Sequence, residues 1–133
     1  MIYTGYYGGL TRIVGDIAKV QVSNSAPVPV DIKFEKAIPD WAFIVKPYKD
    51  GLITKEEYEQ RYTLQLDKFR ENILGVIKYF SSTDKDYILL CYEKPGDFCH
   101  RHILADYINK ALGEDIVKEY VPEVYNQVSI SLF

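Results

Sequence analysis

An almost continuous apolar run, Tyr87–Tyr92, constrains the fold of this chain more than any other segment. Strands with this pattern are covered on both faces, as the inner strands of parallel sheets are. A Pro-Gly turn and an amphipathic stretch follow, and the stretch ends at Gly113. We therefore predict a central parallel strand that leads into a helix, with Asp97 as the N-cap residue of that helix.

Further strand and helix patterns alternate along the chain. Strands are expected at Ile2–Thr4, Asp16–Val22, Trp41–Val45 and Asp115–Tyr120, with a last strand or an apolar docked tail at Tyr125–Phe133. This alternation predicts right-handed crossovers and an α/β fold, with a mainly parallel sheet and helices on its faces. The length of 133 residues suits one domain that spans residues 1–133.

One long helix is predicted in the middle of the chain. Thr54 and Glu57 have the spacing of a capping box, which satisfies amide groups at the start of a helix. Apolar residues then recur at steps of three or four and share one face: Tyr58, Tyr62, Leu66, Phe69, Ile73, Ile77 and Phe80. Gly75 interrupts this stretch, and a kink or a tight packing contact is expected near it.

Charge and composition exclude several classes of protein. Sixteen basic and 19 acidic residues give a net charge of -3, and no segment concentrates lysine and arginine, which disfavours binding of duplex DNA. The chain starts without the features of a signal peptide and has no stretch of about 18 apolar residues, so we expect a cytoplasmic protein with no membrane partner. In that reducing compartment the two cysteines are expected to be thiols.

The turn after the apolar run carries most of the reactive side chains. Glu93 follows the strand, and Cys99, His100 and Arg101 open the next helix. Ligands of open parallel sheets bind at the carboxyl ends of the strands, so we expect a site here. Helical geometry turns His100 toward the core and His102 toward solvent.

These side chains suggest catalytic roles, each with a structural alternative. Glu93 and His100 suit proton transfer, and Cys99, in the first helical turn beside basic groups, is the candidate nucleophile. Arg101 either binds an anion at the helix N-terminus or forms a salt bridge to Glu93. Glu93 either handles protons or accepts backbone amides of the turn, and Cys91 is expected to be a small buried apolar residue.

Two further loops are expected at the same edge of the sheet. Their glycine, hydroxyl, amide and aromatic groups provide the candidate ligand-binding residues Tyr3, Tyr6, Gly8, Ser23, Asn24 and Ser25. The glycine loop, residues 5–9, matches neither dinucleotide nor P-loop spacing, and the alternative is an ordinary connecting turn. For the tyrosines the alternative is a place at the edge of the core.

Zinc is an alternative at this turn, because Cys91, Cys99, His100 and Glu93 are suitable ligand types. Structural zinc sites use paired ligands two to four residues apart at two separate places, and this chain has no second cluster. We therefore expect no metal and no other cofactor, with a zinc site as a third hypothesis that metal analysis of the purified protein would test.

The same turn resembles the signature of the domain of unknown function family numbered 488. The resemblance rests on Leu90-Cys91-x-Glu93 and Cys99-His100-Arg101 with Leu104-Ala105 behind them, and on Ile2-Tyr3-Thr4 and Pro39-Asp40-Trp41, which are similar to short phage-type members. It implies a small intracellular bacterial or phage protein, sometimes suspected of nucleotide or nucleic-acid metabolism, and no established reaction. Many members carry Asp-Val-Arg before a proline, but residues 22–27 here lack that arginine, so its anion-binding role does not carry over.

Two hypotheses of function follow. The first is a pocket for a small anionic, nucleotide-like ligand, with or without catalysis, built from the glycine loop, Ser23–Ser25 and the turn after the central strand. The second is a non-catalytic binding or inhibitory protein in which the Cys-His-Arg turn is a structural latch. The apolar end of the chain would also suit a homodimer.

Overall fold

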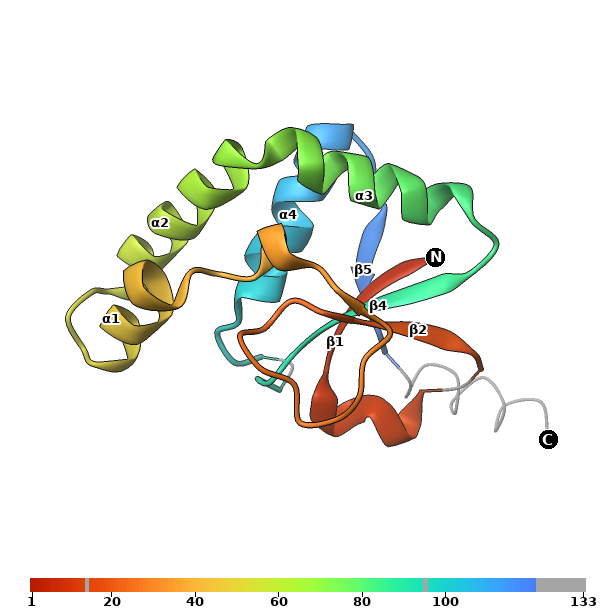
Figure 1. Cartoon of the computed structure of the whole chain (residues 1–133), viewed down its shortest axis with the longest axis horizontal. Helices are drawn as coiled ribbons and strands as arrows, with labels where there is room; N and C mark the ends of the chain where they lie inside the picture. Colours follow the sequence, from red (N-terminus) through yellow and green to blue (C-terminus); the bar gives the residue numbers. More distant parts are fainter. Residues whose placement is uncertain (14, 95, 122–133) are drawn as a thin grey trace.

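Five parallel strands form one sheet in the computed structural model, which describes residues 1–13, 15–94 and 96–121. The strands are β1 Ile2–Tyr6, β2 Ile17–Gln21, β3 Ile32–Lys33, β4 Asp86–Cys91 and β5 Val117–Glu119. Their order is β3-β2-β4-β1-β5, and every neighbouring pair is parallel (Figure 1). The prediction of an α/β fold with β4 at its centre is confirmed.

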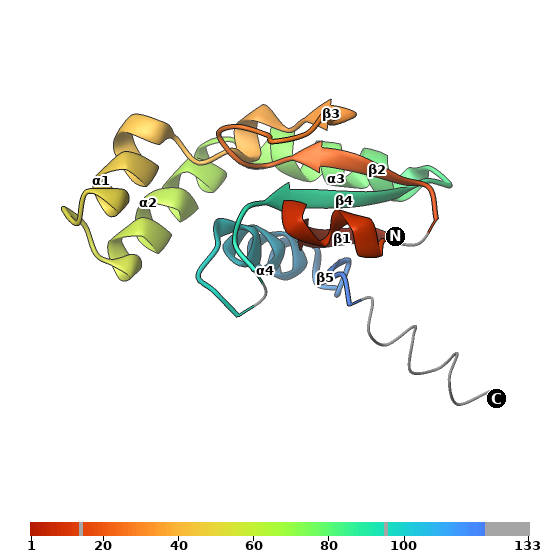
Figure 2. The ribbon, with the colours of Figure 1, turned by 90° about the horizontal axis from the view of Figure 1, so that it is seen from below.

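Helices cover one face of this sheet. They are α2 Lys55–Lys68, α3 Arg70–Ser82 and α4 His100–Leu112. The other helical segments are α1 Lys46–Lys49, the 3-10 helices η1 Tyr7–Arg12 and η2 Glu35–Ala37, and the π-helical turn η3 Trp41–Val45. The main core lies between the sheet and α2, α3 and α4. A smaller cluster around Ile88 and Leu90 lies on the opposite face, where η1, red in Figure 2, packs over the strands.

The capping box and the apolar face of the central helical region are confirmed. Thr54 and Glu57 each bond the other's backbone amide at 3.1 Å. The inward residues of the stripe are buried, but the region forms two helices instead of one, because α2 ends and α3 begins at Phe69. The tight packing contact that was one of the two expectations for Gly75 is not found: this residue lies within α3, and a Cβ there would meet nothing within 4 Å.

Two local predictions are wrong. Trp41–Val45 is not a strand but a π-helical turn that continues into α1, with the Asp40 carboxylate accepting from the Phe43 amide at 2.7 Å. Short apolar runs fit either structure, and this one packs as a turn beside α2. The N-cap residue of α4 is Cys99 rather than Asp97.

The remaining predictions concern the end of α4 and the last residues of the chain. The helix stop is confirmed, because Gly113 has φ 71° at the end of α4. Tyr125–Phe133, expected to be a strand or docked tail, lies outside the described residues. None of the helices in the described segments combines the length and apolarity that crossing a bilayer requires.

Candidate functional site

A cavity of about 160 Å³ lies where β2 and β4 end, and we call it the strand-end cavity. Both strands run parallel, so the residues that follow them, Ser23–Ser25 and Tyr92–Glu93, meet at the same edge. The start of α4 forms another part of the lining, together with residues of η3, α1 and α2. Six candidates that the sequence singled out line this one cavity: Ser23, Asn24, Ser25, Glu93, Cys99 and His100.

The strand-end cavity has a buried floor and an exposed rim. Ser23, Cys99 and His100 are buried at its floor, whereas Glu93 and Trp41 are exposed at its rim. Aromatic side chains from four separate segments line it: Trp41, Tyr48, Tyr58, Tyr92 and Phe98. A single apolar-walled hollow with a few polar groups is the usual form of a small-molecule site.

Hydroxyl groups form two hydrogen bonds beside the cavity. Tyr7 and Ser23 are bonded through their oxygens at 2.9 Å, and Ser25 and Tyr92 at 2.8 Å. The rings of Tyr7 and Tyr92 lie 5.1 Å apart between centroids. Burial raises the pKa of Tyr7, so its hydroxyl keeps its proton at neutral pH. Residues 23–25 and the end of β4 are therefore tied together by side chains.

His100 is held in one tautomer. Its Nε2 bonds the Val22 carbonyl oxygen, which only accepts, so Nε2 carries the proton and Nδ1 is bare. Nδ1 lies 4.0 Å from the Cys99 sulfur. Burial lowers the pKa of His100 to about 4, so the imidazole is neutral at pH 7. His100 points inward and His102 is partly exposed, as helical geometry predicted.

Cys91 and Cys99 are joined in a disulfide, although the sequence predicted two thiols. The fold causes this difference, because it brings the last residue of β4 against the residue that caps α4. In this form Cys99 carries no thiol. The proposed nucleophile would therefore exist only in the reduced protein.

Arg101 does not reach the strand-end cavity. It is fully buried, and its Nε and Nη2 donate to the two carboxylate oxygens of Glu119 at 3.0 and 2.8 Å. Its Nη1 donates to the Glu93 carbonyl oxygen at 2.6 Å and to the Cys91 sulfur at 3.0 Å. The alternative of a salt bridge to the Glu93 carboxylate is not what forms, because the carboxylate partner is Glu119.

Glu119 was not found from the sequence. It lies on β5, beside Thr4 of β1, whose hydroxyl donates to Glu119 Oε1 at 2.7 Å. Burial raises the pKa of Glu119, but hydrogen bonds from Arg101 and Thr4 and the Arg101 charge outweigh it, and the pKa is lowered. Nothing in the sequence marked this residue, because only the strand order places it beside α4.

Three predicted binding residues lie away from the cavity. Tyr3 packs edge-on against Tyr120, with 5.2 Å between ring centroids, and joins the cluster on the other face of the sheet. The Tyr6 ring covers Gly8 and Gly9, where an added Cβ would approach ring carbons to 3.0 and 2.9 Å. The glycine loop thus leaves room for a tyrosine ring.

Lys49 also lines the cavity and was not singled out from the sequence. Its Nζ lies 5.6 Å from the centre of the Trp41 ring. Lys49 and Trp41 were not predicted to lie together, because Trp41–Val45 was expected to be a strand, and only a helical turn places both residues on one wall of the cavity. Tyr58, on the same cavity, has its pKa raised by burial and then by the Glu93 charge, so it remains a hydroxyl donor.

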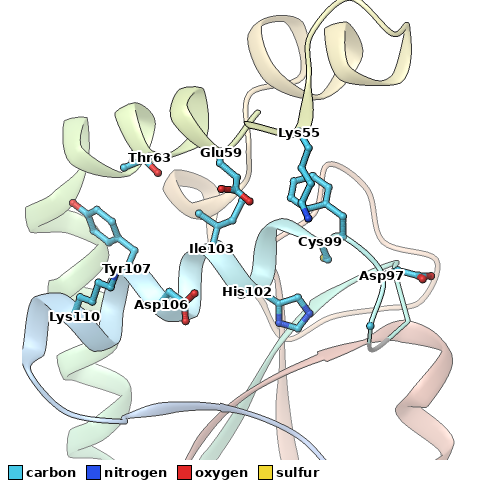
Figure 3. A pocket seen from close by; sticks show the side chains of 12 residues that line it. Lys55, Glu59, Thr63, Asp97, Cys99, His102, Ile103, Asp106, Tyr107 and Lys110 are labelled. Carbon is cyan, nitrogen blue, oxygen red and sulfur yellow. The ribbon is translucent and has the colours of Figure 1, made fainter. Parts of the chain in front are cut away.

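A second and larger hollow of about 470 Å³ lies between α2 and α4, and we call it the α2–α4 groove. Figure 3 shows Lys55, Glu59 and Thr63 on one side and His102 and Asp106 on the other. Its charged side chains have both signs and most are exposed at the surface. Cys99 lines both hollows. The strand-end cavity is the better candidate, because it lies where parallel sheets bind ligands.

These features define a small parallel α/β protein with a polar and aromatic cavity at the carboxyl edge of its sheet. The family model DUF488-N3a, described as the active DUF488-N3 subclade, matches residues 11–112. The chain belongs to this DUF488 family, which confirms the resemblance stated from the Cys-His-Arg turn. No significant match was found among curated proteins or solved structures.

Proposed function

We propose that the strand-end cavity binds a small nucleotide-like ligand, that is, a flat ring that carries an anionic group. The observation that supports this most is the meeting of aromatic faces, hydroxyl groups and one lysine in a single cavity at the carboxyl ends of β2 and β4. Aromatic side chains stack on bases of any kind, and hydroxyl groups and amides orient them.

The size of the cavity limits the ligand. Its volume of about 160 Å³ is well below the roughly 300–1,000 Å³ of pockets that enclose drug-sized molecules. One ring therefore fits inside, and the rest of the ligand lies at the rim. Trp41 and Tyr92 are about half exposed there, at 47% and 48%, so the part of each ring that Lys49 and Tyr7 do not cover is available for stacking.

The anionic group is assigned to Lys49 rather than to Arg101. Arg101 is buried and paired with Glu119, whereas Lys49 is exposed and lines the cavity. Lysine binds phosphate as a point charge on a flexible stem. Glu93 lies on the same rim and would accept hydrogen bonds from an amino or hydroxyl group of the ligand.

Catalysis at this site is a second candidate, favoured by the description of the matched subclade as active. Glu93 is then the proton-transfer residue, because it is exposed at the rim, whereas His100 is buried and its one proton is held on Nε2 by the Val22 carbonyl oxygen. Cys99 would serve as nucleophile only after reduction. Product formation during long incubation with each ligand distinguishes this candidate from binding alone.

The test uses the fluorescence of Trp41, the single tryptophan of the chain. Nucleoside monophosphates, the matching nucleosides and sugar phosphates are titrated into the oxidised protein with a chelator present. We expect saturable quenching by the monophosphates and about tenfold weaker binding of them to Lys49→Gln.

Lys78→Gln is the matched control, because it removes the same charge from an exposed position on α3 outside the cavity. It should bind like the wild type. Equal affinity of the two lysine variants would remove Lys49 from the site, and no response to any of the three ligand classes would refute the proposed function.

A further inference from the structure

Beneath the strand-end cavity lies a cluster that the proposed function does not use. It consists of Cys91, Cys99 and His100, all buried, with one donor atom from each within 4.8 Å of the others. In a tetrahedral zinc site the sulfur and nitrogen ligands lie about 3.5–3.8 Å apart, as the bond lengths of 2.3 and about 2.0 Å require. Opening of the Cys91–Cys99 disulfide and shifts of roughly 1–2 Å would therefore place the three atoms around one ion.

The groups around this cluster prepare it for a metal. Val22 accepts the Nε2 proton of His100, which leaves Nδ1 bare on the side of the Cys99 sulfur. Metal-binding histidines are oriented in this way by a second hydrogen bond to a carbonyl or carboxylate. Arg101 donates to the Cys91 sulfur at 3.0 Å, which favours a thiolate there.

The charges also balance in the buried site. Two thiolates neutralise one divalent ion, the Arg101–Glu119 pair neutralises itself, and the imidazole brings no charge. Sequence spacing argued against zinc, because Cys91 and Cys99 are eight residues apart and form no paired motif. The fold removes that objection by placing the end of β4 against the start of α4.

We propose that the reduced protein binds one soft divalent ion, of the Zn²⁺ type, through Cys91, Cys99 and His100. Cys99 and His100 line the strand-end cavity, so the fourth coordination position faces that cavity and is filled by water. Three protein ligands with one open position are the arrangement found where zinc acts on a bound molecule.

Formation of the site requires an external dithiol reductant. The reductant transfers two electrons and two protons to the Cys91–Cys99 disulfide and becomes a cyclic disulfide, which leaves two cysteine thiols. The ion then displaces one proton from each thiol as the two metal–sulfur bonds form. An excess of the cyclic disulfide reverses this sequence: it takes two electrons from the two thiolates and two protons from water, the Cys91–Cys99 disulfide forms again, and the ion is released. The same cysteines therefore make either a disulfide or a metal site.

The test uses Co²⁺ as a coloured substitute for Zn²⁺ in the full chain. After reduction and removal of the reductant, Co²⁺ is titrated without oxygen, and the absorption of cobalt–thiolate bonds is recorded. We expect one ion per chain, displacement of cobalt by Zn²⁺, and no such absorption from the disulfide form.

Variants assign the ligands. Cys91→Ser, Cys99→Ser and His100→Gln should each weaken cobalt binding by more than the roughly 10–100-fold that loss of an outer-shell partner costs. His102→Gln is the matched control and should bind within about threefold of the wild type. If a cysteine variant does not fold, the reduced wild type still decides the question.

Failure to form cobalt–thiolate absorption in reduced wild type would overturn the proposal. A disulfide that the dithiol cannot open in the folded protein, or unchanged affinity in Cys91→Ser, would overturn it as well. The ligand titration of the proposed function uses oxidised protein with chelator, so either proposal can fail without the other.

Discussion

Arg101 and Glu119 form a side-on pair in which two guanidinium nitrogens donate to both carboxylate oxygens, at 3.0 and 2.8 Å. The pair joins α4 to the edge strand β5, and Thr4 on β1 adds a hydrogen bond at 2.7 Å. The sequence suggested Glu93 as a partner of Arg101, but the carboxylate that Arg101 binds is Glu119. Neither Arg101 nor Glu119 lines the strand-end cavity, so this pair leaves the rim of the cavity free for a ligand.

We predict that Glu119→Gln lowers the free energy of unfolding by about 3 kcal/mol, because it leaves the fully buried Arg101 without a charged partner. Glu93→Gln is the matched control: its carboxylate is exposed, so its effect should stay within about 0.5 kcal/mol. Denaturant unfolding monitored by circular dichroism measures both values. Equal losses in the two variants would contradict the assigned partner.

The pH dependence of stability should report His100 in the disulfide-bonded, metal-free protein. Burial lowers its pKa to about 4, whereas histidine in an unfolded chain titrates near about 6.5. Above the unfolded value both states are neutral. As the pH falls from about 6.5 toward 4, only the unfolded chain takes up the proton, so stability falls by up to about 3 kcal/mol.

Unfolding between pH 7 and 5 measures this slope above the range in which carboxylates titrate. His100→Gln should lose most of this slope, and His102→Gln, which removes the other histidine of the chain, is the control. Arg101 and His102 lie close to His100 and lower its pKa further, whereas the hydrogen bond to Val22 raises it. Burial is the largest of these effects and sets the direction of the pKa shift. A flat wild-type profile would show that the imidazole is not buried as described.

Sequence patterns predicted the parts of the fold that depend on local periodicity. The apolar run gave a central strand, the Thr54–Glu57 capping box began a helix, and Gly113 ended one. Trp41–Val45 failed because five apolar residues satisfy a strand and a helical turn equally. The end of α2 at Phe69 was not predicted, because no glycine or proline stands there to indicate the end of a helix.

The candidate site was predicted as far as chain order allowed. Parallel strands bring their carboxyl ends to one edge, so Ser23–Ser25 and Glu93 could be expected together. The partner of Arg101 could not, because Glu119 is placed by the pairing of β5 with β1, and strand order is not written in local patterns. The contact of Cys91 with Cys99 likewise depends on how α4 docks on β4.

Two glycines should respond oppositely to alanine. Gly75 lies within α3 with open space at its Cβ position, so Gly75→Ala should stabilise the protein by up to about 1 kcal/mol. Gly113 has φ 71°, a conformation that strains any residue with a Cβ, so Gly113→Ala should destabilise by about 1 kcal/mol or more. Thermal unfolding of both variants provides the comparison. If Gly75→Ala is less stable than the wild type, a tight packing contact exists at Gly75, as the sequence suggested.

The cap at Asp40 should control both stability and ligand affinity. Its carboxylate accepts from the Phe43 amide at 2.7 Å and so holds the turn that carries Trp41 toward the rim and leads to Lys49. Asp40→Ala should cost about 1 kcal/mol of stability and, by loosening that wall, weaken binding of a nucleoside monophosphate. Asp84→Ala is the control, because it removes an exposed carboxylate between α3 and β4, outside the cavity, and should change neither value appreciably. Denaturant unfolding and Trp41 fluorescence titration give the two readouts, and an Asp40→Ala protein that is less stable but binds with unchanged affinity would separate this turn from the ligand site.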